Sequence, residues 1–215
     1  MTRASPPAVR FRRLGLSDAA AVAHSATAAF AGSAFYQRAL GLDDRRFARY
    51  WAAFFRLAFA DPAARVFAFD DAGRVNAAVA VAYDGFPRPL TGLRFLLRLL
   101  WRIGASAWLK YLRFVRAYSH VMHRPAGDRR VEACGLWLFV DPGARGAGLG
   151  ADLVRTALDA VRAEGKTLAT GFVDAGNQPL LTFYRRLGFT ISPPFDFLGL
   201  PAATIERRFG GDDSP

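Results

Sequence analysis

The sequence predicts a single α/β domain in which a mixed sheet carries helices on both faces. Two observations lead to this fold class. The expected elements run strand, helix, helix, strand, strand, and then alternate as strand, helix, strand, helix and strand. In addition, 52% of the 215 residues are hydrophobic and 22% are charged, which suffices for one buried core. We therefore expect one domain over 1–215, with disorder confined to 1–7 and 210–215.

The N-terminal half is expected to form a strand, two helices and a β-hairpin. Ser17-Asp18 is the expected cap of the first helix, which reaches Phe30. An aromatic-rich apolar face at helical spacing predicts the second helix. A turn-forming Asp-Asp-Ala-Gly cluster favours a hairpin between the two strands that follow. The expected elements are 9–14, 17–30, 43–59, 65–69 and 75–83.

The most informative stretch is 136–150, LWLFVDPGARGAGLG, which joins a buried strand to a glycine-rich turn and a helix. Its apolar run, 136–140, is typical of a strand buried on both faces. The glycines let the backbone approach a ligand closely, and the helix start presents unpaired N–H groups at the positive end of its dipole. This order predicts an anion site, to which Arg145 adds charge. The other expected elements are a helix from 149 that closes at 164–166, a helix over 177–189, and strands over 166–174, 195–198 and 204–209.

Spacing separates this site from two other nucleotide-binding designs. A Walker phosphate loop needs Gly-Lys followed by Ser or Thr, which 149–151 lacks. The pattern Gly146-x-Gly148-x-x-Ala151 formally fits the dinucleotide fingerprint. However, a Rossmann half-fold needs several further strand–helix units after that turn, and only about 65 residues follow Gly150.

Two ordered motifs in this chain resemble the Gcn5-related N-acetyltransferases (GNAT), which bind acyl-coenzyme A. The first is 145–150, RGAGLG, which matches the family signature Arg/Gln-Gly-x-Gly-x-Gly/Ala and follows Val-Asp-Pro as it does in that family. The second is 177–189, which is similar to the family's Asn-to-Tyr helix ending in Leu-Gly-Phe. The resemblance covers roughly 131–191.

The resemblance implies a mostly antiparallel sheet of about six to seven strands and direct transfer of an acetyl group from acetyl-CoA to a primary amine, without a metal. It implies that a backbone N–H on the strand of Leu138 and Val140 polarises the thioester carbonyl, while the N–H groups of 145–150 hold the pyrophosphate. Asn177 is expected to cap its helix and to touch the pantetheine arm. The implied contacts to coenzyme A are Leu138, Phe139, Val140, Arg145, Gly146, Ala147, Gly148, Leu149, Gly150, Asn177 and Tyr184.

Two residues are the main candidates for proton transfer. Glu132, at the start of the strand, is the carboxylate best placed by sequence to accept the amine's proton, and its alternative is an ordinary surface glutamate. Tyr184 matches the family's acid that protonates the leaving thiolate, although a tyrosine would also pack well on that apolar helix stripe. His120 and His123 are weaker candidates, because His123-Arg124-Pro125 departs from the His-Pro of the subgroup.

The segment 85–127 contains no acidic residue and carries much of the net charge of +11. Its apolar spacing predicts two helices within a basic insert over 86–126, with Arg94, Arg98 and Arg102 on one helical face. The favoured interpretation is an insert that packs its apolar face on the sheet and leaves its arginines in water. Two others stay open: a lid that walls the acceptor pocket, and a surface that adheres to anionic lipid.

These observations predict a cytoplasmic N-acetyltransferase for a small-molecule amine, since 183–201 most resembles small-molecule detoxifying acetyltransferases. The lone Cys134 excludes an intrachain disulfide and is interpreted as buried packing. Residues 1–10 lack the apolar core of a signal peptide. The alternatives are a non-catalytic acyl-CoA-binding module and a peripheral membrane protein. Acetyl-CoA and the amine are the expected partners of a monomer or homodimer, and no recognition motif for nucleic acid accompanies the charge.

Overall fold

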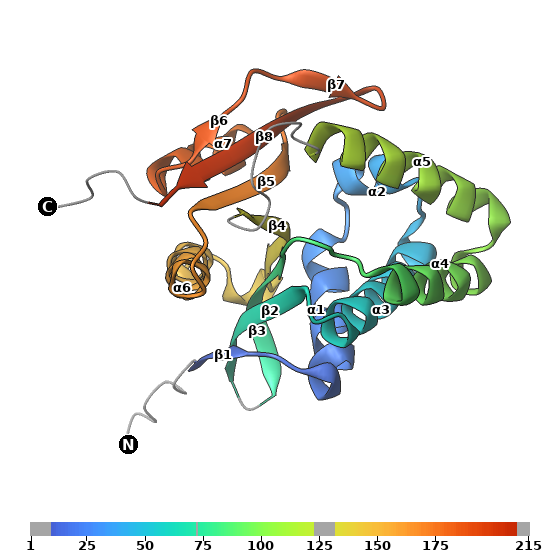
Figure 1. The fold of residues 1–215 in the computed structure, drawn as a ribbon, viewed down its shortest axis with the longest axis horizontal. Coiled ribbons are helices and arrows are strands. Elements are labelled where there is room, and N and C mark those ends of the chain that lie inside the picture. The colour runs from blue at the N-terminus through green and yellow to red at the C-terminus, as the bar shows by residue number, and fades with distance from the viewer. Residues whose placement is uncertain (1–9, 72, 123–131, 210–215) are drawn as a thin grey trace, which may run out of the picture.

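The fold is organised around a twisted sheet of eight strands (Figure 1), and the computed structural model describes residues 10–71, 73–122 and 132–209. Within these residues the strand order is β1-β2-β3-β4-β5-β8-β6, with β7 also paired to β8. All neighbouring pairs described are antiparallel except β4 with β5. The strands are β1 (Arg10–Arg13), β2 (Ala64–Asp71), β3 (Arg74–Ala82), β4 (Glu132–Val140), β5 (Leu168–Asp174), β6 (Thr190–Ile191), β7 (Phe195–Phe197) and β8 (Leu200–Arg208).

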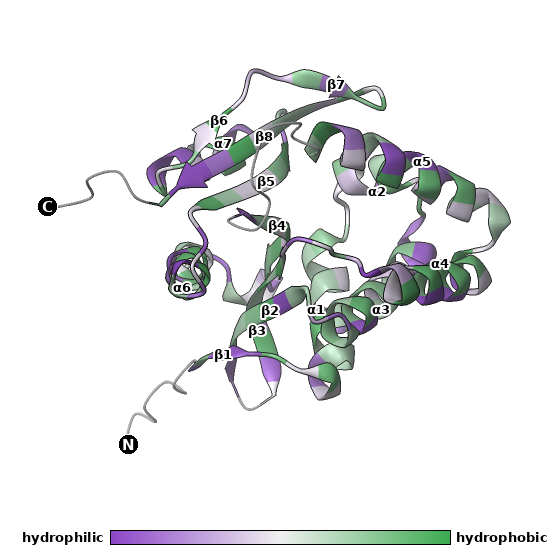
Figure 2. Ribbon diagram, in the orientation of Figure 1, coloured by the Kyte–Doolittle hydropathy of each residue, from purple (hydrophilic) through white to green (hydrophobic). Residues whose placement is uncertain are grey.

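Helices cover both faces of the sheet, as Figure 1 shows. α6 and α7 pack on one face, and α1 to α5 build the apolar core on the other. Figure 2 shows that the central strands and α1 are predominantly hydrophobic. The helices are α1 (Ala19–Phe30), α2 (Ala34–Leu40), α3 (Asp44–Ala60), α4 (Pro89–Ile103), α5 (Ala105–Met122), α6 (Leu149–Ala163) and α7 (Gln178–Arg186), with short 3-10 turns η1 (Leu16–Asp18) and η3 (Pro142–Ala144).

The predicted fold class is confirmed, with two differences in its elements. The sheet exceeds the expected six to seven strands because the C-terminal segment forms β6, β7 and β8 where the sequence predicts two strands. In the described residues before the hairpin there are also three helices instead of two, since α2 is only seven residues long and too short to show a periodic pattern. α4 and α5 are the two helices predicted within 86–126. The segments expected to be disordered, 1–7 and 210–215, lie outside the described residues.

Aromatic side chains from α1, α3 and β4 form the centre of the larger core. Trp51 of α3 is fully buried; its ring stacks on Phe30 of α1 at 4.9 Å and meets Trp137 of β4 edge-on at 4.7 Å. Such aromatic pairs add about 0.5–1.5 kcal/mol each beyond their buried area. The apolar face predicted for the second helix is therefore the face that anchors β4.

The two central strands, β4 and β5, separate halfway along their length. They are parallel and paired only from Glu132 opposite Leu168 to Gly135 opposite Gly171. Beyond these pairs β4 stays with β3 up to Val140, whereas β5 stays with β8. The backbone groups of β4 that would otherwise bond to β5 are therefore open in its second half, next to the turn that leads into α6.

A β-bulge in β4 changes which side chains face each layer. In the pairing with β3, Trp137 lies opposite Ala80 and Gly135 lies opposite Val81, so Leu136 is an extra residue. Because side chains alternate along a strand, the extra residue puts Glu132 on the same side as Trp137. Without the bulge, the carboxylate would face the α6 layer.

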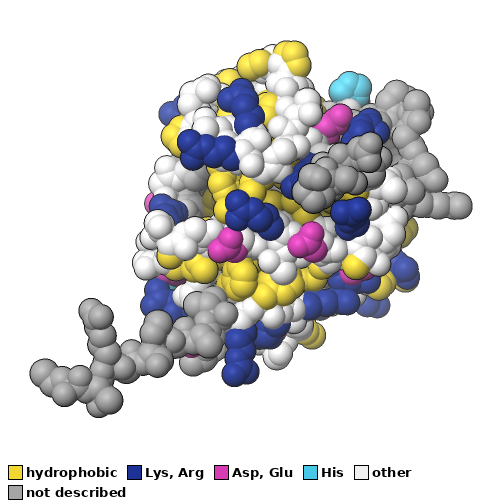
Figure 3. All heavy atoms as spheres, turned by 90° about the vertical axis from the view of Figure 1, so that its left-hand side faces the viewer, with side chains coloured by type: hydrophobic (Ala, Val, Ile, Leu, Met, Phe, Trp, Pro, Cys, Tyr) yellow, Lys and Arg dark blue, Asp and Glu magenta, His cyan; other side chains and the backbone are white. Residues whose placement is uncertain are grey.

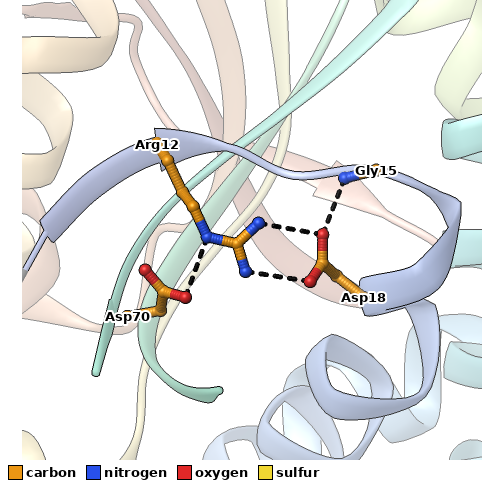
Figure 4. Close-up of polar contacts among 4 residues, drawn as sticks. All are labelled: Arg12, Gly15, Asp18 and Asp70. Carbon is orange, nitrogen blue, oxygen red and sulfur yellow. Dashed lines mark hydrogen bonds and ion pairs between the residues drawn. The ribbon is translucent and has the colours of Figure 1, made fainter. Parts of the chain in front are cut away.

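Arg12 joins β1 to the start of α1 and to the hairpin (Figure 4). Its guanidinium donates to both carboxylate oxygens of Asp18, at 2.9 and 3.1 Å, and to Asp70 at 2.8 Å. Asp18 also accepts from the Gly15 N–H, and its side chain does not cap α1. Asp18 is the N-cap residue of α1, as predicted, but its side chain makes no capping hydrogen bond, because a guanidinium is a stronger partner for a carboxylate than a helix amide.

We expect Arg12→Gln to lower the free energy of unfolding by about 1 kcal/mol at pH 7, since Arg12 is partly exposed. The hydrogen bonds from Arg12 hold the pKa of Asp18 below its ordinary value of about 4. This contribution is present above pH 4 and is lost as the pH falls through the lowered pKa. Urea unfolding at pH 7 and near pH 2, with Arg10→Gln as control, measures it. A deficit of equal size at both pH values would contradict the ion-pair explanation.

Candidate active site

The conformation of the glycine-rich turn after β4 depends on the buried Asp141 and on Gly146 and Gly148. Asp141 accepts hydrogen bonds from the Gly143 N–H and from Arg74, both at 2.9 Å. Gly146 and Gly148 have φ values of +83° and +78°, a region that other residues occupy only with strain. A Cβ at either position would meet nothing within 4 Å, so the turn leaves open space where its side chains would be.

The helix that starts at this turn is uncapped. Gly148 occupies the cap position of α6 and has no side chain to offer. Within the described residues, the N–H groups of Gly148, Leu149 and Gly150 donate no hydrogen bond to the protein. A phosphate supplies the acceptors that such a helix start lacks, and the helix dipole favours its charge. The turn therefore fits a pyrophosphate.

Two further contacts hold the turn against the sheet. The Arg145 guanidinium donates to the Ala29 carbonyl at the end of α1, at 2.9 Å. A Cβ at Gly150 would lie 3.2 Å from Val140 Cγ2, so a larger residue there would require Val140 to shift by a few tenths of an ångström. Gly146, Ala147 and Gly148 are exposed on the outside of the turn, as a site for an anion requires.

A cavity of about 600 Å³ lies where β4 and β5 separate. Its walls come from the second half of β4, from β5, from the end of α1 and from α6 and α7. Of the contacts predicted for coenzyme A, those that line this cavity are Leu138, Phe139, Val140, Arg145, Gly150, Asn177 and Tyr184. Gly146, Ala147, Gly148 and Leu149 belong to the turn between Arg145 and Gly150, and the structure places them next to this cavity without making them part of its wall.

Tyr184 of α7 reaches the cavity from the C-terminal layer. Its ring is buried between Phe183 and Phe189, with centroids at 5.1 and 5.3 Å. Within the described residues its hydroxyl has no hydrogen-bond partner. Burial raises the pKa of Tyr184 well above its ordinary value, so the hydroxyl keeps its proton at neutral pH. Asn177 caps α7 as predicted, accepting from the Leu180 N–H at 3.1 Å.

A second cavity, of about 350 Å³, lies beneath α4 and α5. Glu132 and Cys134 of β4 line it, because the bulge turns both toward this side. The two cavities have four lining residues in common, and so they adjoin each other at the point where β4 bends. These shared residues are Tyr36, Leu136, Trp137 and Phe172.

Glu132 is held by its neighbour on β5. The Thr170 hydroxyl donates to Glu132 Oε1 at 2.9 Å, which leaves the second carboxylate oxygen for another donor. Cys134 contacts the Tyr118 hydroxyl at 3.4 Å, and burial raises the pKa of its thiol. A thiol that stays protonated is a poor nucleophile, in agreement with a packing role for Cys134.

Tyr36 is a candidate that the sequence did not reveal. It lies on the unpredicted α2, packs edge-on against Trp137 at 5.0 Å and lines both cavities. Burial raises the pKa of Tyr36, and its side chain lines the first cavity together with Tyr184. Tyr36 could have been identified from the sequence only if α2 had been predicted.

The histidine candidates do not join this site. His120, near the end of α5, is exposed and lines neither cavity. His123 lies outside the described residues. In the described part of the chain, no group of three or more His, Cys, Asp or Glu side chains could hold a metal ion. Helices long and apolar enough to cross a membrane are also missing from the described residues.

Comparisons with known proteins agree on one domain type. Residues 111–191 match the model of the acetyltransferase (GNAT) domain. An N-acetyltransferase from Staphylococcus aureus Mu50 superposes with a TM-score of 0.60 at 15% identity, covering 94% of this chain and 98% of its own. No curated protein matches the sequence.

Two of the similar structures are complexes with coenzyme A or acetyl-CoA. The PaiA N-acetyltransferase from Thermoplasma acidophilum, in complex with coenzyme A, has a TM-score of 0.55 at 12% identity over 94% of this chain and 99% of its own. A GNAT family acetyltransferase from Brucella melitensis, in complex with acetyl-CoA, has a TM-score of 0.53 at 17% identity over 96% and 92%. At these identities the likeness concerns the fold.

Proposed function

We propose that this chain, whose residues 111–191 match the GNAT acetyltransferase domain model and whose fold is that of GNAT acetyltransferases, transfers the acetyl group of acetyl-CoA to the primary amine of a small molecule. One observation carries the proposal: β4 and β5 separate directly beside an uncapped helix start. The first feature opens a cavity for a pantetheine arm, and the second offers N–H groups to the pyrophosphate.

The residues of the chain divide the reaction between them. Acetyl-CoA supplies an acyl group on a thiolate that can leave. Open N–H groups in the second half of β4, around Leu138, polarise the thioester carbonyl. Glu132 accepts the proton of the amine, directly or through a water, as the C–N bond forms. Tyr184 gives its proton to the sulfur as the C–S bond breaks. One proton is therefore taken from the amine and one is given to the leaving thiolate.

The two cavities fit a direct attack in a ternary complex. The amine enters from the side of Glu132 and the thioester from the side of Tyr184, and they meet where the two cavities adjoin, beside the residues that line both. Holding both reactants in one place removes the entropic cost of their encounter, and no covalent acyl-enzyme is needed. The protonated Cys134 thiol is in keeping with this route.

The proposed function is tested by measuring the release of coenzyme A from acetyl-CoA in the presence of amines. Free thiol should appear in proportion to acetylated amine across a panel of primary amines. Tight binding of acetyl-CoA with no thiol release from any amine would instead favour the non-catalytic acyl-CoA-binding module.

We expect Tyr184→Phe to reduce kcat roughly 100-fold, the lower range for general acid catalysis. The Michaelis constant for acetyl-CoA should change little, because the phenylalanine ring keeps the contacts with Phe183 and Phe189. Steady-state kinetics with circular dichroism as a folding control measures the effect. Undiminished turnover would show that Tyr184 is a packing residue only.

We expect Gly148→Ala to weaken coenzyme A binding about tenfold, because a left-handed alanine costs about 1–2 kcal/mol and moves the amides of the turn. Gly165→Ala is the matched control: Gly165 follows the same helix, has φ +79° and also has open space around its Cβ position. Calorimetric titration with coenzyme A measures both variants. Equal losses of affinity would mean that the turn does not hold the pyrophosphate.

A further inference from the structure

The cavity beneath α4 and α5 has an unusual lining for a protein of net charge +11. Eleven of its 24 described lining residues are aromatic, and they come from α2 to α5, from the sheet and from the loop before α4. Examples from the helices are Tyr50, Phe95, Tyr111 and Phe114. Rings of this density favour a ligand with a flat or bulky apolar body.

The charge of this cavity is opposite to that of the whole protein. Among its described lining residues, the only charged side chains are Asp84 and Glu132. Arg94, Arg98 and Arg102, on the same pair of helices, are exposed and line neither cavity. A cation therefore meets two carboxylates and several aromatic faces here, both of which attract it.

The tyrosine hydroxyls of the wall add polarity without charge. Burial raises the pKa values of Tyr111 and Tyr118, so both phenols stay neutral at physiological pH. The Tyr118 hydroxyl is already engaged with Cys134 Sγ. The other polar side chains of the described wall include five hydroxyls and two carboxylates, and most of the remaining residues are apolar. A polyhydroxylated or polycationic acceptor would bury part of its polar groups against these apolar side chains, which is unfavourable.

Resting on the proposed function, we propose that the acceptor is a small monocationic amine carried by an aromatic body, such as an arylalkylamine. The amine points toward the free oxygen of Glu132, and the ring lies among the aromatic residues of α3, α4 and α5. A volume of about 350 Å³ suits a ligand of one or two rings.

A panel of three amines tests this substrate class by coenzyme A release. The value of kcat/KM for 2-phenylethylamine should exceed that for spermidine and for n-butylamine by at least 100-fold. Turnover that favours spermidine or n-butylamine would overturn the aromatic acceptor and leave acetyl transfer intact. An absence of release from all amines, with acetyl-CoA bound, would overturn both proposals.

A variant in the wall gives a readout that does not depend on turnover. Val115→Lys places a cation in the cavity, from a half-buried position on α5. Calorimetric titration with 2-phenylethylamine alone should show at least a tenfold loss of affinity, whereas coenzyme A binding should be unchanged. Leu109→Lys, on an exposed position of α5, is the matched control. Equal affinity in Val115→Lys and Leu109→Lys would contradict binding of the amine in this cavity.

A second inference comes from an independent feature, the outer face of α4. Leu90, Leu93, Leu97 and Trp101 recur every three or four residues and form one stripe along the helix. The leucines are 52–70% exposed and Trp101 is 89% exposed, whereas Phe95, Leu99 and Ile103 fill the inner face. An apolar stripe of this length on a solvent-exposed surface is typical of an interaction site.

The charges beside the stripe indicate which kind of surface it binds. Arg94, Arg98 and Arg102 each follow a residue of the stripe, and within the described residues none forms an ion pair. By contrast, acidic side chains are interspersed among the basic ones on the face that carries α6 (Figure 3). A second copy of this chain would bring two rows of arginine together, and like charges repel. An anionic surface accommodates both the arginines and the apolar side chains.

The geometry points to α4 as a helix that lies on an anionic lipid surface, with Trp101 and the leucines among the lipid headgroups and acyl chains. Tryptophan is well suited to this boundary because its ring is apolar and its N–H is polar. Arginine beside it reaches the phosphates while its stem stays in contact with apolar groups.

Co-sedimentation with vesicles of phosphatidylcholine containing 30% phosphatidylserine tests this surface. Binding should exceed that to pure phosphatidylcholine at least tenfold and should fall by a similar factor in the triple variant R94Q/R98Q/R102Q. The control R162Q/R185Q/R186Q removes equal charge from α6 and α7 and should retain binding. Equal loss in both triple variants would mean that total charge, and not α4, drives the association. Concentration-dependent dimers abolished by Trp101→Ala would instead identify self-association and overturn the proposal.

Discussion

The separation of β4 and β5 is the constraint on which the rest of the structure depends. Parallel strands ordinarily bond along their whole length, and these two bond only over Glu132–Gly135 and Leu168–Gly171. β4 can leave its partner because Trp137 and Phe139 are buried in the core of α1 and α3, which holds the strand from the other side. The hydrogen bonds that β4 forgoes become available to a ligand in the cavity.

The bulge at Leu136 explains why one strand serves two cavities. It turns Glu132 toward α5 while leaving Leu138 and Val140 on the side of α6. The proposed base therefore lines the second cavity, while Leu138 and Val140, on the same strand, line the first. A strand without the extra residue would turn Glu132 toward α6 and leave Asp84 as the carboxylate of the second cavity among its described lining residues.

The sequence predicted the parts of the site that depend on local backbone chemistry. The glycine turn, the start of α6 and the Asn177 cap are set by residues that are near neighbours in the chain, and all three are present. The separation of β4 from β5 and the position of Tyr36 were not predictable in this way. Both result from contacts between distant segments, and α2 is too short for its own spacing to reveal it. The three C-terminal strands likewise depend on pairing with β8.

Amide hydrogen exchange with and without coenzyme A tests most directly whether the opened half of β4 and the turn after it form one nucleotide site. Protection should rise in two places, over 136–140 and over 145–150, while the amides of α4 and α5 should change little. No added protection in either segment at saturating coenzyme A, or protection confined to another part of the chain, would contradict binding between β4 and β5.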